Sequence, residues 1–207
     1  MSYKPTPSRF SRPAAARQSG LEESWHSDSA LDLHLYAQSL RAAAKALLGR
    51  RNPNLALQSE WDAGPILLLY RQALELHLKA VVCEGRGFLK TPTDSITLSN
   101  THSLRWLSQI VRQIINAVGW QRDFTCSGIA SLPDFMAKVE ELDNLDPIKS
   151  LVFTKDKAAV AQKLQIVGDP VFISQTEALL DLLDSSADAL AAATADLQAD
   201  PRNATIQ

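Results

Sequence analysis

Apolar residues recur at spacings of three and four along residues 29–48, the pattern of a helix with one apolar stripe. The stripe consists of Leu31, Leu35, Tyr36, Leu40, Ala43, Ala44 and Leu47. We expect this first helix to end at Gly49, and the segment 50–54, which contains Pro53, to form a turn.

Residues 65–82 are apolar on nearly every side of a helical projection. A helix of that kind is usually buried on all sides, so the pattern predicts a central helix over about 63–83. Asp62 is the expected N-cap, with Pro65 in the first turn. Gly85 and Gly87 are expected to end this helix.

A polar stretch over 86–100 separates this helix from the next and predicts a long loop. The third helix is expected to begin at Thr101-His102-Ser103-Leu104, with Thr101 or Asn100 as its cap, and to run to Gly119.

Two later helices are marked by capping signals. Ser131 and Asp134 approximate a capping box in front of a fourth helix over 132–142. Ser174 and Glu177 form a similar box in front of a last helix that ends before Pro201. Between them, the segments 151–154, 164–167 and 171–173 are typical of short strands.

These elements predict a mainly α fold, an antiparallel bundle of about five helices with a short extended or hairpin segment near 150–173. Residues 25–200 form the expected single helical domain. Residues 1–24, rich in Pro, Ser and Arg, are expected to be a flexible basic tail, and 201–207 a C-terminal tail.

Composition narrows the class of protein. The net charge is −2 and there are two cysteines without metal-ligand spacing, so neither a disulfide scaffold nor a structural zinc site is expected. No apolar run is long enough to cross a bilayer, so we expect no membrane partner and a cytoplasmic location. No two of the four histidines lie at i and i+4, and we expect no metal and no cofactor.

A ladder of charged residues crosses the apolar central helix. Arg71, Glu75 and Lys79 are four residues apart and fall on one helical face. Charges on such a helix must be paired or must line a cleft, because isolated burial is costly. The ladder is either a structural salt-bridge network or part of a binding site.

Two histidines extend the candidate site. His77 follows Arg71 after five residues, so it is either a hydrogen-bonded core residue or the partner of Arg71 in a ribonuclease-type pair. His102 lies at the start of the third helix, where the helix dipole disfavours the protonated ring. It is either a neutral general base or a capping residue.

The run PILLLYRQALELHLKAVV at 65–82, followed after a loop by THSLRWL at 101–107, resembles the helical bundles of the HEPN superfamily. The segment ELDNLDPIKSLVFTKDK at 141–157 is more weakly similar to a segment of the same proteins. The resemblance implies a helical bundle, commonly dimeric, often from bacterial defence or toxin–antitoxin systems. Active members are metal-independent ribonucleases with an Arg-x4–6-His motif, which Arg71 and His77 satisfy in spacing. Many other members are binding or assembly modules.

Two functions remain open. In the first, the chain is an RNA-directed module, either an RNA-binding domain or a metal-independent endoribonuclease. Its catalytic groups are then Arg71, His77 and His102, and its binding groups are Glu75 and Lys79. In the second, it is a non-catalytic domain for dimerisation or partner binding. The expected partners are a second copy of the chain, RNA, and a protein such as an antitoxin.

Overall fold

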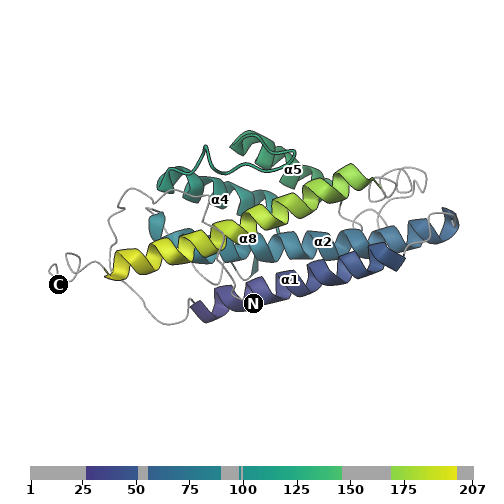
Figure 1. Cartoon of the computed structure of the whole chain (residues 1–207), viewed down its shortest axis with the longest axis horizontal. Coiled ribbons are helices and arrows are strands. Elements are labelled where there is room, and N and C mark those ends of the chain that lie inside the picture. The colour runs from purple at the N-terminus through teal and green to yellow at the C-terminus, as the bar shows by residue number, and fades with distance from the viewer. Residues whose placement is uncertain (1–26, 51–55, 90–97, 99, 146–168, 200–207) are drawn as a thin grey trace, which may run out of the picture.

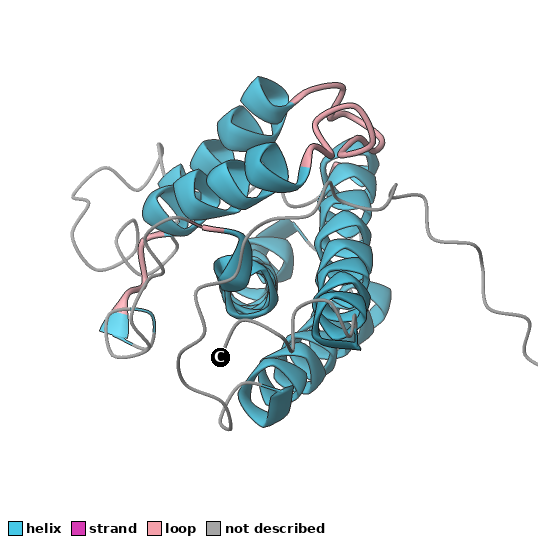
Figure 2. Ribbon diagram, turned by 90° about the vertical axis from the view of Figure 1, so that its left-hand side faces the viewer, coloured by secondary structure: helices cyan, strands magenta, loops and turns pink. Residues whose placement is uncertain are grey.

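The computed structural model describes residues 27–50, 56–89, 98, 100–145 and 169–199. Within them the fold is mainly α, as predicted, and contains no strand (Figures 1 and 2). The elements are α1 (Ser27–Arg50), α2 (Ala56–Gly85), the short 3-10 helix η1 (Arg86–Phe88), α4 (Leu104–Val118), α5 (Leu132–Asn144) and α8 (Pro170–Ala199). Among these helices, none has an apolar stretch of the length that a membrane span requires.

Helix α2 lies at the centre of the bundle and contacts α1, α8 and α4, while α5 packs on α4 (Figure 1). Residue pairs give the directions. Tyr70 and His77 of α2 face Glu177 and Asp184 of α8, so these two helices run parallel. His34 of α1 faces the same Asp184, and α1 runs antiparallel to both.

The core confirms that 65–82 is a helix buried on nearly every side. Ile66, Tyr70, Leu74 and Leu78 are at most 1% exposed. Each such side chain contributes roughly 1.5–3 kcal/mol by leaving water. Helix α2 therefore fixes the position of every element packed around it, including the ends of α4 and α5 that form the site described below.

Helix α4 is capped at both ends by local chemistry. Ser103, rather than Thr101 or Asn100, is the N-cap, and its hydroxyl accepts from the Trp106 N–H. Gly119 ends the helix in the left-handed region at φ 81°, as the sequence predicts, because glycine adopts that region without strain.

The capping box of α5 is confirmed. Ser131 Oγ accepts from the Asp134 N–H at 3.3 Å, and Asp134 Oδ2 accepts from the Ala130 N–H at 3.2 Å. Together they satisfy two backbone donors around the helix start. The helix then runs to Asn144, which places Asp143 in its last turn.

Helix α2 begins earlier than predicted. It starts at Ala56, so Asp62 is not its N-cap and Pro65 lies inside the helix. An interior proline removes one backbone hydrogen bond and crowds the preceding turn, at a cost of about 3 kcal/mol. Pro65 is exposed, and the packing of α2 against α1, α8 and α4 offsets this cost.

Helix α8 also begins earlier than predicted. It starts at Pro170, and the Asp169 carboxylate accepts from the Val171 N–H at 2.8 Å. Asp followed by Pro is a favourable pair for the N-cap and first helical position, and it acts before the box at Ser174 is reached. Residues 171–173 are therefore helical, and the prediction of an extended segment there is wrong. The tails and the segments 151–154 and 164–167 lie outside the described residues.

Candidate functional site

The charged ladder of α2 faces α4 and α5. Arg71, Glu75 and Lys79 are 7%, 2% and 6% exposed, so all three side chains are buried. Lys79 Nζ lies 3.0 Å from Glu75 Oε1, and Arg71 Nη1 lies 3.8 Å from Glu75 Oε2. Glu75 thus stands between two cations of its own helix, in the spacing that the sequence indicates.

His102 joins this ladder from the segment that leads into α4. Its Nδ1 lies 2.9 Å from Glu75 Oε1 in hydrogen-bond geometry. An ionised carboxylate only accepts, so Nδ1 carries the proton and donates it to Glu75. The side chain of His102 is 73% exposed. The result is a carboxylate–imidazole pair whose carboxylate is buried and whose imidazole faces solvent.

Arg71 ties three elements together at this point. Its Nη2 donates to Asp143 Oδ1 of α5 at 3.0 Å and to the backbone carbonyl of His102 at 3.3 Å. Arg71 therefore holds the backbone from which the His102 ring projects. With a neutral imidazole, two cations and two carboxylates balance, which is the condition under which buried charge is tolerated.

The exposed face of α4 continues from His102 without an acidic residue. Helix α4 contains no Asp or Glu. Its exposed polar side chains are Arg105, Gln109, Arg112, Gln113 and Asn116. At helical spacing, Arg105, Arg112 and Asn116 share one face. Arg105 is 4.0 Å from Glu140 of α5 in a solvent-exposed pair, which is worth little.

The structure therefore brings together four of the five residues singled out from the sequence, Arg71, Glu75, Lys79 and His102. His77 is not among them. It projects from α2 about 160° around the helix from Glu75, towards α1 and α8. Arg71 pairs with Asp143 of α5 whereas His77 lies near Asp184 of α8, so these two residues do not form the pair that their spacing indicates.

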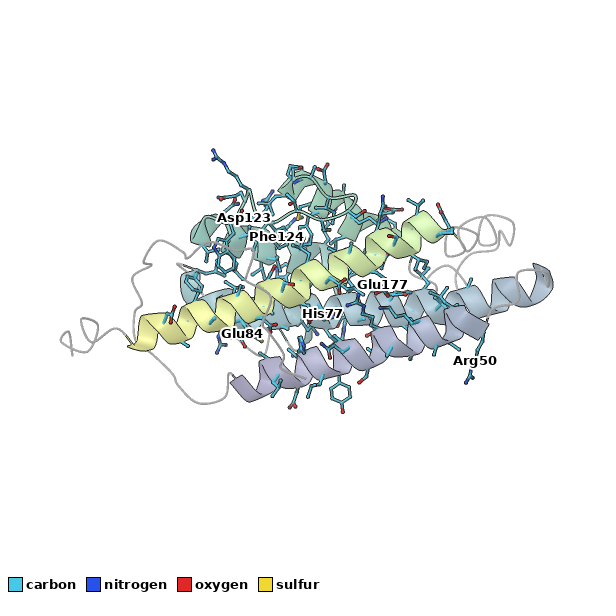
Figure 3. The ribbon with its side chains drawn as sticks, in the orientation of Figure 1. Arg50, His77, Glu84, Asp123, Phe124 and Glu177 are labelled. Atoms are coloured by element: carbon cyan, nitrogen blue, oxygen red, sulfur yellow. The ribbon has the colours of Figure 1, made fainter. Side chains whose placement is uncertain are left out.

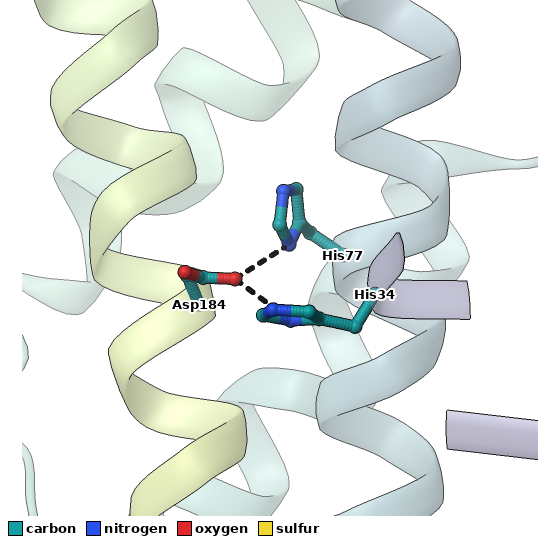
Figure 4. Close-up of side chains that lie close together, drawn as sticks. All are labelled: His34, His77 and Asp184. Atoms are coloured by element: carbon teal, nitrogen blue, oxygen red, sulfur yellow. Dashed lines mark ion pairs between the residues drawn. The ribbon is translucent and has the colours of Figure 1, made fainter. Parts of the chain in front are cut away.

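His77 belongs to a second polar group, formed with His34 of α1 and Asp184 of α8 (Figure 4). His34 Nδ1 lies 2.8 Å from Asp184 Oδ1, and His77 Nδ1 lies 3.6 Å from the same oxygen. The two rings meet edge to face, with centroids 5.9 Å apart. Burial, followed by the nearby charges of His34 and Arg41, lowers the pKa of His77 to about 4.

A third polar group lies one heptad away along the same three helices. Tyr70 Oη donates to Glu177 Oε1 at 2.7 Å, and Arg41 Nε donates to Glu177 Oε2 at 2.6 Å. Lys45 Nζ is 2.6 Å from Glu177, and Arg41 also pairs with Asp181. Burial acts to raise the pKa of Glu177, but hydrogen bonds from Arg41, Lys45 and Tyr70 hold it below the ordinary value.

The two groups follow one register. Arg41 and His34, Tyr70 and His77, and Glu177 and Asp184 are each seven residues apart, or about 10.5 Å along a helix. The sequence contains this heptad on each helix separately. To recognise the two groups from the sequence, one must know which turns of α1, α2 and α8 lie side by side in the bundle. No local sequence pattern gives that alignment. Sequence reasoning therefore missed the His34–His77–Asp184 group.

Helix α2 thus carries two polar surfaces of different character. The one towards α4 and α5 reaches solvent at His102 and continues into an acid-free helix face, and it is the better candidate for contact with a large ligand. Comparison of the chain with protein-family models, curated proteins and solved structures found no match.

Proposed function

We propose that this protein is an RNA-directed helical-bundle module of the HEPN type, in which His102 acts as a metal-independent general base. The observation that carries the proposal is the hydrogen bond from His102 Nδ1 to the buried Glu75 carboxylate, with the rest of the imidazole exposed beside α4. The resemblance at 65–82 and 101–107 supports the same function.

Glu75 determines which nitrogen of His102 is available. Because Nδ1–H donates to Glu75, the lone pair of the neutral ring is on Nε2. Such a nitrogen can remove the proton of a ribose 2′-OH. The 2′-oxygen then attacks the adjacent phosphorus and forms a 2′,3′-cyclic phosphate. The 5′-oxygen leaves and takes a proton from solvent.

Arg71 has a different role in this proposal from the one that its spacing to His77 suggests. Its guanidinium is buried and donates to Asp143 and to the His102 carbonyl. Arg71 is therefore a positioning residue for His102. Lys79 pairs with Glu75 at 3.0 Å and holds the carboxylate in place.

In this proposal, the exposed cations of α4 contact the phosphate backbone of the RNA. Arg105 and Arg112 lie on the acid-free face of this helix, on the same element that His102 precedes. Arginines on an exposed helix face suit phosphate oxygens, and each phosphate that they neutralise makes binding more sensitive to salt.

The experiment compares RNA binding by two charge-matched variants, Arg112→Ala and Arg50→Ala. Arg50 is an exposed arginine at the end of α1, away from α4 (Figure 3). We expect Arg112→Ala to weaken binding to a short single-stranded RNA and to reduce its salt dependence, with Arg50→Ala close to wild type. If both variants bind the RNA with the same affinity as wild type, α4 is not the RNA-binding surface.

A specific observation favours a second candidate function, dimerisation or partner binding without catalysis. Leu31, Leu35 and Tyr36 of α1 are 57%, 51% and 69% exposed. Leu31 and Leu35 lie one turn apart and form an exposed apolar strip, and Tyr36 lies beside it, about 100° further around the helix. Exposed apolar surfaces of this kind often join two copies of a chain. In this proposal the strip packs on the same strip of a second copy. Light scattering tests it, because a dimer that becomes monomeric in Tyr36→Glu supports the strip and a wild-type monomer contradicts it.

A further inference from the structure

The second polar group of α2 has the composition of a metal site rather than of a hydrogen-bond network. His34, His77 and Asp184 come from α1, α2 and α8, and each directs one possible ligand atom to a common region (Figure 4). These three atoms all lie within 4.8 Å of one another. Two imidazoles and one carboxylate are ligands that divalent transition metals, zinc in particular, accept.

The hydrogen-bonding state of the group is the second observation. His77 is 1% exposed, and neither of its ring nitrogens has a hydrogen-bond partner among the described residues. Asp184 Oδ1 also lacks one, because its approach to the two rings is outside hydrogen-bond geometry. Buried polar atoms are rarely left in this state, since each costs about 1–3 kcal/mol. The three side chains therefore approach one another as ion pairs, with no hydrogen bond between Asp184 Oδ1 and either ring.

We propose that His34, His77 and Asp184 bind one divalent transition-metal ion of the zinc class and thereby clamp α1, α2 and α8. Two ligands of a tetrahedral zinc ion, each about 2.0–2.1 Å from the metal, lie about 3.4 Å apart. The observed separations of 2.8 Å and 3.6 Å bracket that value. The two histidine nitrogens lie within 4.8 Å of each other, so side-chain rotations that also adjust this third separation give a coordinating geometry.

The surroundings of His34 suit a metal ligand. Gln38 supports His34 from behind, with its amide nitrogen 2.8 Å from His34 Nε2. A glutamine amide can donate to this nitrogen or, after rotation, accept from it, so His34 Nδ1 can exchange its proton for the ion.

A route to solvent lies beside His34, on the side of the group away from Tyr70 and Glu177. A cavity of about 190 Å³, lined by His34, Glu84, Asp188 and several alanines, opens there. Burial raises the pKa of Glu84, and the charge of Asp188 raises it further. A cation at His34 would relieve this repulsion, and water in the cavity can complete the coordination.

The test is a zinc titration of the full chain after treatment with a chelator, followed by calorimetry. We expect one zinc ion per chain. His34→Gln, His77→Gln and Asp184→Asn should each weaken zinc binding at least ~10-fold, since even indirect damage to a zinc site has that effect. Cobalt should give the visible absorption of nitrogen and oxygen coordination, and each variant should lose it.

Two matched controls separate this site from incidental binding. His102→Ala removes an exposed histidine on the other side of α2, and Asp181→Asn removes a carboxylate one turn before Asp184. Both should bind zinc as wild type does. The proposal is overturned if wild type does not bind one zinc ion per chain, or if the three site variants bind zinc with the same affinity as wild type. Circular dichroism reports folding, and if His77→Gln does not fold, the partly exposed His34 decides the question through His34→Gln.

Discussion

Replacement of Glu75 by glutamine removes the carboxylate at the centre of the buried ladder and changes little in shape. Glu75 is 2% exposed, with Lys79 Nζ at 3.0 Å, His102 Nδ1 at 2.9 Å and Arg71 Nη1 at 3.8 Å. After the change, Arg71 and Lys79 stay buried with one carboxylate fewer. The amide oxygen can still accept a hydrogen bond, so the loss comes mainly from charge.

Removing one partner of a buried ion pair costs about 3–5 kcal/mol, and the hydrogen bond that remains puts the cost of Glu75→Gln at the lower end, about 3 kcal/mol. A domain of this size has a total stability on the order of 5–15 kcal/mol, so the effect is large. Urea unfolding followed by circular dichroism measures it, provided that the denaturant slope matches wild type.

The matched control is Glu140→Gln. Glu140 is more than half exposed and lies 4.0 Å from Arg105, so its removal should cost less than about 1 kcal/mol. The reasoning is refuted if Glu75→Gln and Glu140→Gln lower the free energy of unfolding equally. That result would mean that the ladder is solvated and that Glu75 does not organise His102.

The other predictions concern packing, capping and pH. Gly85→Ala places a Cβ 2.4 Å from Ile114 Cγ2 and should lower the free energy of unfolding by about 1–3 kcal/mol. In Gly49→Ala the new Cβ meets nothing within 4 Å, and the free energy of unfolding should rise slightly. Urea unfolding midpoints distinguish the two variants. Ser103→Ala should cost about 1 kcal/mol and Thr101→Ala little, by the same measurement, because the hydroxyl of Ser103 is the cap of α4. The pKa of His77 is lower in the folded chain, about 4, than the unfolded value of about 6.5, so protonation favours unfolding. Wild type should lose stability relative to His77→Gln as pH falls from about 6.5 to about 4, by about 3 kcal/mol, and parallel pH curves for the two proteins would contradict this.

Local chemistry accounts for what could be predicted. The apolar run at 65–82 predicts the central helix, and Ser131 with Asp134 predicts the start of α5, because both signals act within a few residues. Helix starts were missed where two local signals compete. Asp169 and Pro170 precede the box at Ser174, so α8 begins one turn early.

The candidate site was predictable only in part. The i and i+4 spacing of Arg71, Glu75 and Lys79 shows that they share a face, and the position of His102 at a helix start marks it as a candidate. The contribution of Asp143 depends on how α5 packs, and the partners of His77 depend on which helices cover its side of α2. Such tertiary alignments are invisible in a single sequence.

Cleavage of RNA by the full chain in the presence of a chelator tests the central claim most directly. The substrate is a short single-stranded RNA, and the comparison is the same RNA with 2′-deoxyribose at the cleaved position. We predict that wild type cleaves only the first substrate and leaves a 2′,3′-cyclic phosphate, and that His102→Ala slows the reaction roughly 10²–10⁴-fold. No cleavage by wild type, or an unchanged rate in His102→Ala, would contradict the account.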